Sequence, residues 1–223
     1  MTFFSGQSRK RLATFVIGYF LNTTDQQVND LSRYGGLIFD CDGTLTDSMP
    51  LHFEAWRETM ARFGIEFTEQ RFYSMAGMPT DKIIRVLADE QSVDVDPEVA
   101  GAEKELAFRQ RIPRLTPLQR VCDIARAYHN VVPMAVASGG DREGVWAQIK
   151  HLQMESLFAA VVTAEDTKKH KPEPDVFLKA AELLKVAPET CLVFEDSPLG
   201  LDAAARASMD CVDVRDFTFY QAG

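Results

Sequence analysis

The chain has 223 residues, enough for one large domain or for a core with a smaller module. Its 33 acidic residues and 24 lysines and arginines give a formal net charge of −9, which opposes binding to the phosphate backbone of a nucleic acid. A small anionic substrate stays compatible with this charge, because a local cation can outweigh the overall field. The four cysteines form no CxxC pair and fit a reducing compartment.

Residues 1–34 differ in pattern from the rest of the chain. A basic patch over 9–11 precedes an apolar run over 12–21, and the first acidic residue is Asp25. This pattern is typical of targeting segments, but the run is shorter than the roughly 20 residues needed to cross a bilayer. We expect an N-terminal extension packed on a cytoplasmic protein without a membrane span. Organelle targeting by this segment is the alternative.

An apolar run over 36–39 ends abruptly in Asp40 and Asp42. The run predicts a strand that is buried on both faces, as in a parallel sheet. Open α/β sheets bind ligands at the carboxyl ends of their strands, so the two carboxylates are expected in an active site. Asp40 is a candidate nucleophile, and Asp42 is a candidate acid or base. For this segment alone, an Asp-Gly turn without a catalytic role is the alternative.

Helical spacing of apolar residues follows over 50–113. It predicts a helix from about Leu51 to Phe63, ended by Gly64, and two or three more helical stretches over 69–75, 80–90 and 97–111. Asp96 is the expected N-cap of the last one. A helical block of this length is too long for a simple connection. We therefore predict that residues 50–113 form a helical cap, inserted between residues 35–49 and 114–223 of the core.

Strands and helices then alternate to the end of the chain. Strands are predicted over 131–137, 159–162, 191–194 and 211–214, and helices over 118–128, 143–152, 175–184 and 198–207. Repeated β-α units predict a parallel sheet with right-handed crossovers. The predicted fold is an α/β, Rossmann-like core with three layers and a parallel sheet, together with the inserted α-helical cap.

Three predicted strands end in polar side chains, which one parallel sheet would bring to the same edge. These side chains are Asp40 with Asp42, Ser138, and Glu195 with Asp196. Two carboxylates about 4 Å apart repel each other by roughly 4 kcal/mol at an effective dielectric constant of about 20, so the cluster needs cations or protons. Because all its donors are oxygens, it suits a hard cation such as Mg²⁺. The alternative for Glu195 and Asp196 is a helix N-cap.

Lys171 lies in the loop after the third predicted strand. It can supply a fixed positive charge beside Asp40 and a transferring phosphoryl group, although a solvated surface lysine is the alternative. Ser138 and the amide of Gly139 can donate hydrogen bonds to phosphate oxygens near the start of the next helix. The pattern therefore indicates a site for phosphoryl transfer.

Together, Asp40-Cys41-Asp42-Gly43-Thr44, Ser138, Lys171-Pro172 and Glu195-Asp196-Ser197 resemble the four motifs of the haloacid dehalogenase superfamily, in the same order. The resemblance covers about residues 35–214. The insertion is similar to the cap of the β-phosphoglucomutase-like branch, which includes fructose-1-phosphatase-like proteins. The resemblance implies a Mg²⁺-dependent phosphatase that hydrolyses a small phosphorylated metabolite, a sugar phosphate, through an aspartyl-phosphate on Asp40.

The resemblance also implies roles for the other residues. Asp42 would protonate the leaving oxygen and then activate water. Its backbone carbonyl would join Asp40 and Asp196 as a ligand of Mg²⁺, and Glu195 would bind the metal directly or through water. Thr44 and Ser138 would hold the phosphoryl group.

In the cap, His52 and Trp56 match positions that face the site in this branch, and Lys104 would reach the substrate when the cap closes. Packing in the cap core is the alternative for Trp56, and solvent exposure is the alternative for Lys104. We expect a monomer or a weak homo-oligomer.

Two other activities are compatible with this resemblance. A hexose-phosphate mutase would need an arginine in the cap, where this chain has Thr80, so hydrolysis is favoured. A non-catalytic regulatory protein on a phosphatase fold would be expected to lose some motif residues, and all of them are present. Dehalogenase chemistry is disfavoured, because dehalogenases of the superfamily need neither a second aspartate nor a metal.

Overall fold

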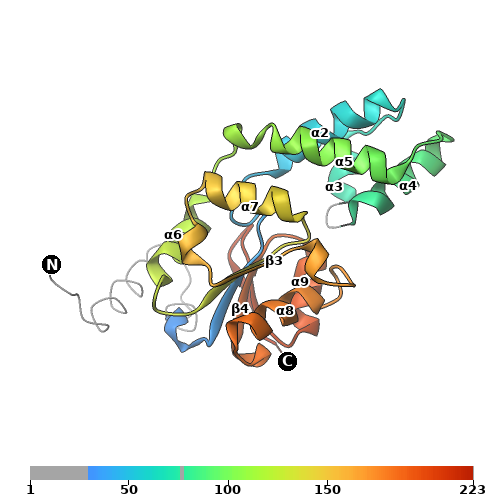
Figure 1. Cartoon of the computed structure of the whole chain (residues 1–223). Coiled ribbons are helices and arrows are strands. Elements are labelled where there is room, and N and C mark those ends of the chain that lie inside the picture. Colours follow the sequence, from blue (N-terminus) through green and yellow to red (C-terminus); the bar gives the residue numbers. More distant parts are fainter. Residues whose placement is uncertain (1–29, 76–77, 223) are drawn as a thin grey trace.

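The computed structural model describes residues 30–75 and 78–222. These residues form an α/β core and a separate group of helices above one edge of its sheet (Figure 1). The basic patch and the apolar run of the N-terminal extension lie outside the described residues. Within these residues, every helix is too short or too polar to cross a membrane.

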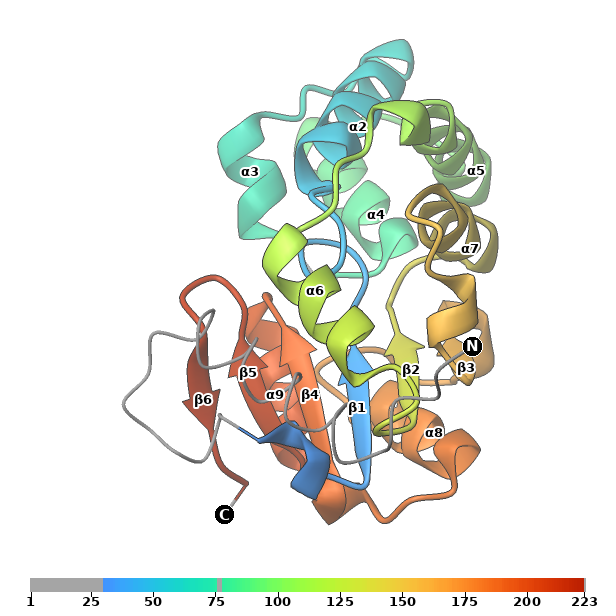
Figure 2. The same cartoon turned by 90° about the vertical axis from the view of Figure 1, so that its left-hand side faces the viewer.

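In the described part of the chain, six strands form one sheet in the order β3–β2–β1–β4–β5–β6 (Figure 2). The strands are β1 (Gly36–Phe39), β2 (Met134–Ala137), β3 (Ala160–Val162), β4 (Cys191–Glu195), β5 (Asp210–Asp213) and β6 (Thr218–Tyr220). The first five are parallel, as predicted. The prediction missed β6, which pairs antiparallel with β5 at the edge of the sheet.

Helices cover both faces of the sheet and make the predicted three layers. On one face lie α6 (Gln119–Tyr128) and α7 (Arg142–His151), and on the other lie α8 (Asp175–Leu184) and α9 (Pro198–Arg206). The central strand β1 is buried along its whole length. Because side chains alternate along a strand, Leu37 and Phe39 pack in the cluster under α6, and Ile38 packs in the cluster under α8.

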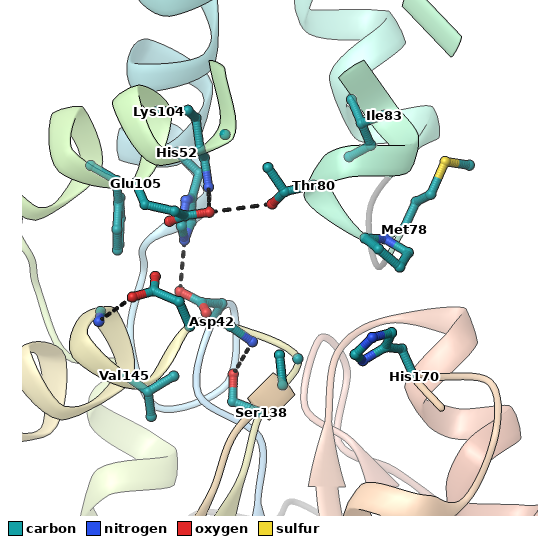
Figure 3. A pocket seen from close by; sticks show the side chains of 18 of the residues that line it. Asp42, His52, Met78, Thr80, Ile83, Lys104, Glu105, Ser138, Val145 and His170 are labelled. Carbon is teal, nitrogen blue, oxygen red and sulfur yellow. Dashed lines mark hydrogen bonds and ion pairs between the residues drawn. The ribbon is translucent and has the colours of Figure 1, made fainter. Parts of the chain in front are cut away.

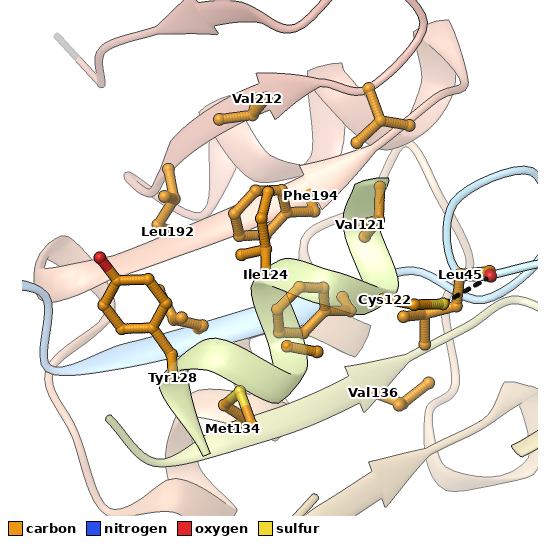
Figure 4. Close-up of a cluster of buried hydrophobic side chains, with 14 of the residues drawn as sticks. Leu45, Val121, Cys122, Ile124, Tyr128, Met134, Val136, Leu192, Phe194 and Val212 are labelled. Atoms are coloured by element: carbon orange, nitrogen blue, oxygen red, sulfur yellow. Dashed lines mark hydrogen bonds between the residues drawn. The ribbon is translucent and has the colours of Figure 1, made fainter. Parts of the chain in front are cut away.

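The cluster under α6 brings together residues that are far apart in the sequence (Figure 4). The ring of Phe39 stacks on that of Phe194, with 4.7 Å between the centroids, and this fixes β1 against β4. A short helical turn before β1, η2 (Leu31–Arg33), joins the same cluster, because Leu31 is buried there and its amide donates to the hydroxyl of Tyr128. The packed core therefore begins before β1.

The helices of the cap are α2 (Met49–Arg62), α3 (Glu69–Ser74), α4 (Thr80–Gln91) and α5 (Pro97–Arg109). They have their own hydrophobic cluster, which includes Trp56, Phe72 and Ile84. The side chain of Asp96 accepts hydrogen bonds from the amides of Glu98 and Val99, which confirms the predicted N-cap of α5.

The cap rests on α7 of the core. A small cluster from α2 and α5, which includes Leu51 and Phe108, packs against Ala147 of α7. At the same junction Arg109 of α5 forms an ion pair with Asp141, the N-cap of α7, at 3.1 Å. These contacts hold α2 and α5 above the carboxyl ends of the parallel strands.

Candidate active site

The central residues of the site come from neighbouring strand ends. Asp40 follows β1, Ser138 follows β2 and Glu195 ends β4, and β1 lies between the other two strands. The Nζ of Lys171, from the loop before α8, donates to Asp40 Oδ1 and to Glu195 Oε2, both at 2.6 Å. All three charged side chains of this contact are buried. The structure thus brings together Asp40, Lys171 and Glu195.

The electrostatics of this cluster leave an excess of negative charge. Burial and the nearby carboxylate of Glu195 raise the pKa of Asp40 well above its usual range, against the opposing effect of Lys171. Burial and Glu195 likewise raise the pKa of Asp196 to about 7. Burial alone would lower the pKa of Lys171, but the two carboxylates around it raise the value, so this lysine stays a cation.

The residues present fit a divalent metal ion. Asp40, Glu195 and Asp196 each offer a carboxylate oxygen, and these oxygens all lie within 4.8 Å of one another. Oxygen donors and uncompensated negative charge are what a hard cation such as Mg²⁺ requires. The side chain of Asp42 lies outside this set of carboxylates.

Glu195 is held on both of its oxygens. Its Oε2 accepts a hydrogen bond from Lys171. Its Oε1 accepts hydrogen bonds from the amides of Asp196 and Ser197 and from the hydroxyl of Ser197. The N-cap of α9 is Ser197, whose hydroxyl accepts from the amide of Gly200, so Asp196 is not needed for capping.

The turn after β1 lies directly against Asp196. Gly43 has φ +79°, and a Cβ on it would lie 2.3 Å from Asp196 Oδ2. The hydroxyl of Thr44 donates to Asp196 Oδ1 at 3.1 Å. The structure thus places Thr44 on a carboxylate of the predicted metal site, where its hydroxyl orients Asp196.

Asp42 points toward the cap and is surrounded by hydrogen-bond donors. Its Oδ1 accepts from Ser48 at 2.7 Å and from Gln148 at 3.0 Å, and the Nε2 of His52 lies 2.9 Å away. Burial opposes ionisation of this carboxyl group, but His52 and these hydrogen bonds hold its pKa well below the usual range. Asp42 is therefore an anion that links the core to α2 of the cap.

Sequence reasoning missed Ser48 and Gln148. Gln148 lies on the same face of α7 as the buried Val145 and Ile149, and it bonds both Asp42 and the hydroxyl of Thr46. A polar residue at a buried position of an amphipathic helix was a signal that could have identified it.

The cap side of the site comes from α2, α4 and α5. The imidazole of His52 stacks on the ring of Phe108 at 3.6 Å. The alternative of solvent exposure for Lys104 is wrong, because its side chain is 5% exposed, lies over the rings of Trp56 and Phe108, and donates to Glu105 at 2.9 Å. Trp56 is buried in the cap cluster, which agrees with the alternative of packing in the cap core, and it also lines the cavity.

A cavity of about 620 Å³ lies between the cap and the carboxyl ends of the parallel strands (Figure 3). Its core side includes Asp40, Asp42, Ser138, Gly139 and Lys171, and its cap side includes His52, Thr80, Lys104 and Glu105. The Oγ of Ser138 accepts from the amide of Gly140, which orients the hydroxyl at the end of β2. A Cβ on Gly139 would meet open space.

The parallel sheet, the buried carboxylate–lysine centre and the helical cap define a class of α/β enzymes with a capped active site. Comparison with protein families identifies the class, because the haloacid dehalogenase-like hydrolases match residues 37–214. The chain belongs to this family.

Two relatives and one solved structure show which proteins the chain resembles. The chain is 40% identical over 184 residues to the fructose-1-phosphate phosphatase YqaB of Escherichia coli, a match that covers 82% of this chain and 97% of the relative. It is 27% identical to a phosphorylated carbohydrates phosphatase of Thermotoga maritima, over 78% of this chain and 82% of the relative. The fold matches that of a β-phosphoglucomutase from Clostridium difficile with a TM-score of 0.74, at 23% identity over 82% of this chain and 88% of that one.

Proposed function

We propose that the protein is a Mg²⁺-dependent phosphatase that hydrolyses a small sugar phosphate through an aspartyl-phosphate on Asp40. The observation that carries this proposal is the contact of Lys171 with Asp40, at the edge of a cavity that the cap covers. The two relatives described above, named for phosphatase activity on fructose 1-phosphate and on phosphorylated carbohydrates, support the same reaction and substrate class.

Asp40 is the proposed nucleophile. One of its oxygens attacks phosphorus while the bond to the leaving oxygen breaks, and water later cleaves the phosphoryl group from Asp40. Lys171 keeps the carboxylate in place through its 2.6 Å hydrogen bond, and its charge would stabilise the negative charge that develops on the phosphoryl oxygens. The hydroxyl of Ser138 and the amide of Gly139 are proposed to donate to those oxygens.

Asp42 is the proposed proton carrier. Its three polar neighbours all contact Oδ1, and this fixes the direction of Oδ2. The low pKa of Asp42 keeps this group ionised in the free enzyme, which is the form that can accept a proton. A bound phosphate dianion raises that pKa, so the group can take a proton and then give it to the leaving oxygen. It then takes a proton from the attacking water.

Mg²⁺ would be held by Asp40, Asp196 and Glu195, together with the backbone carbonyl of Asp42, and it would neutralise the phosphate charge that these acidic residues repel. Thr44 keeps Asp196 in place by a hydrogen bond.

The test is a panel of sugar monophosphates assayed for phosphate release with Mg²⁺ or with EDTA. We expect release with Mg²⁺ only, and Asp40→Asn should lower kcat to background because an amide is not a nucleophile here. Circular dichroism should show that this variant is folded. Release that persists in Asp40→Asn would contradict the proposed nucleophile, and a lack of release from every sugar phosphate would contradict the phosphatase.

The same panel separates hydrolysis from phosphoryl transfer within a substrate. Conversion of glucose 1-phosphate to glucose 6-phosphate, primed by the bisphosphate, would indicate a mutase. The described cap side of the cavity has Thr80 where a mutase needs arginine, and this supports water as the acceptor.

A further inference from the structure

Glu105 lines the cavity from the cap, whereas the proposed nucleophile lines it from the core. It lies on α5, its side chain is 18% exposed, and its Oε1 accepts from Lys104 at 2.9 Å and from Thr80 at 3.2 Å. Figure 3 shows this carboxylate between Lys104 and Thr80, across the cavity from Ser138. A substrate whose phosphate lies beside Asp40 would therefore place its carbon chain toward Glu105.

Glu105 is an anion in this position. Burial opposes its ionisation, but the charges of Lys104 and His52 hold the pKa of the carboxyl group below the usual range. The ion pair has a second effect, because it neutralises Lys104. This buried lysine is therefore not a free cation for a ligand.

The lining of the whole cavity carries more acidic than basic side chains. Among the described residues that line it, nine are carboxylates and two are lysines, and none is an arginine. Lys171 is bound to Asp40 and Glu195, and Lys104 is bound to Glu105. A metal ion at Asp40 and Asp196 would compensate charge on the core side only. On the cap side, the described residues leave no lysine or arginine for a second phosphate.

We propose that Glu105 determines the substrate class: it accepts a hydrogen bond from a hydroxyl group of a sugar or polyol, and it excludes substrates with a second phosphate. The inference rests on the proposed phosphatase activity. A carboxylate has about four acceptor positions, and Lys104, Thr80 and Asp141 use three of them, which leaves one for a substrate hydroxyl. Discrimination of this kind comes both from the bonds to the correct substrate and from repulsion of the wrong one.

The test compares fructose 1-phosphate with fructose 1,6-bisphosphate, which carry the same phosphoester at C1. Removal of that phosphate is measured for both, as kcat/KM. The wild-type enzyme should prefer the monophosphate by at least tenfold. In Glu105→Gln this preference should fall at least tenfold, since the neutral amide no longer repels the second phosphate and Lys104 becomes available to bind it. The KM for fructose 1-phosphate should rise, because one acceptor is lost.

Glu103→Gln is the matched control. Glu103 lies on the same helix, its side chain is 41% exposed and it pairs with Arg62, away from the cavity lining. This variant should keep the wild-type preference. If Glu105→Gln fails to fold because Lys104 is left unpaired, the double variant Lys104→Gln with Glu105→Gln removes both charges and should also weaken the preference.

Two results would overturn the role of Glu105: equal use of both substrates by the wild type, or an unchanged preference in a folded Glu105→Gln enzyme. These results differ from failure of the proposed function, in which the wild type releases no phosphate from any sugar phosphate with Mg²⁺.

Discussion

Gly43 combines a left-handed backbone with a close approach to Asp196. Only glycine adopts this conformation without strain, and the missing side chain leaves room for the carboxylate of Asp196. Gly64 has a similar φ of +75°, but a Cβ there would meet nothing within 4 Å. Substitutions at Gly43 and Gly64 therefore separate the cost of the strained backbone from the cost of the contact with Asp196.

We predict that Gly43→Ala displaces Asp196 and raises the Mg²⁺ concentration for half-maximal activity at least tenfold. Gly64→Ala has only the backbone strain, about 1–2 kcal/mol of stability, and should keep the Mg²⁺ dependence of the wild type. Phosphate release is measured against Mg²⁺ concentration, and stability by urea unfolding. Equal Mg²⁺ dependence in the two variants would refute the role of this contact.

The sequence could predict some site residues because their position follows from one strand. Asp40, Ser138 and Glu195 each follow or end a strand, so a parallel sheet brings them together whatever the rest of the chain does. Lys104 and Glu105 could not be located this way. The burial of Lys104 depends on Trp56 and Phe108, from two different helices of the cap.

Among the helices and strands, those with a clear apolar pattern could be predicted from the sequence, and those without one could not. The helices and the parallel strands follow from apolar periodicity, and their predicted ends differ by a few residues from those observed. Strand β6 has three residues with side chains that are exposed or half-buried, so its sequence shows no buried run. It exists because β5 offers an edge to which it can bond.

The turn η2 is another element that only packing reveals. Leu31 is buried under α6, and the hydroxyl of Tyr34 donates to Asp210 Oδ2 at 2.8 Å, which ties the segment to β5. Burial and the carboxylate of Asp210 raise the pKa of Tyr34 to about 12, although Arg33 acts in the opposite direction. Residues 30–34 are thus anchored to the core by apolar contacts and by hydrogen bonds.

We predict that a chain lacking residues 1–34 is less stable than one lacking residues 1–29 by about 2–5 kcal/mol, the usual cost of removing a large buried side chain. The two truncations differ only in residues 30–34, so each serves as the other's reference. Urea unfolding followed by circular dichroism measures the difference. Coincident unfolding curves would show that η2 does not contribute to the core.

The acidic site opposes folding of the whole protein when no metal is bound. The pKa of Asp196 is raised to about 7, and that of Asp40 is raised as well, each by burial first and then by Glu195. A carboxyl group with a raised pKa binds more protons in the folded state than in the unfolded state. Its contribution to stability is therefore complete below pH 4 and is lost as the pH rises through about 7.

We predict that metal-free protein in EDTA loses stability relative to Asp196→Asn as the pH rises from about 4 to 7. Mg²⁺ should reverse this loss in the wild type, by about 2.7 kcal/mol at a concentration of 100 times Kd, and should have a smaller effect on the variant. Thermal unfolding at several pH values, with and without Mg²⁺, provides the measurement. The prediction fails if the two proteins show the same pH dependence in EDTA.

The cap and the sheet pack in separate clusters, so they can evolve independently of each other. The residues of α5 that face the cavity belong to neither of the clusters that hold the sheet together. Substitutions there can alter which metabolite enters, while the strands that carry Asp40 and Glu195 keep their neighbours. A duplicated copy of the gene can therefore acquire a new substrate without first having to rebuild the machinery of hydrolysis.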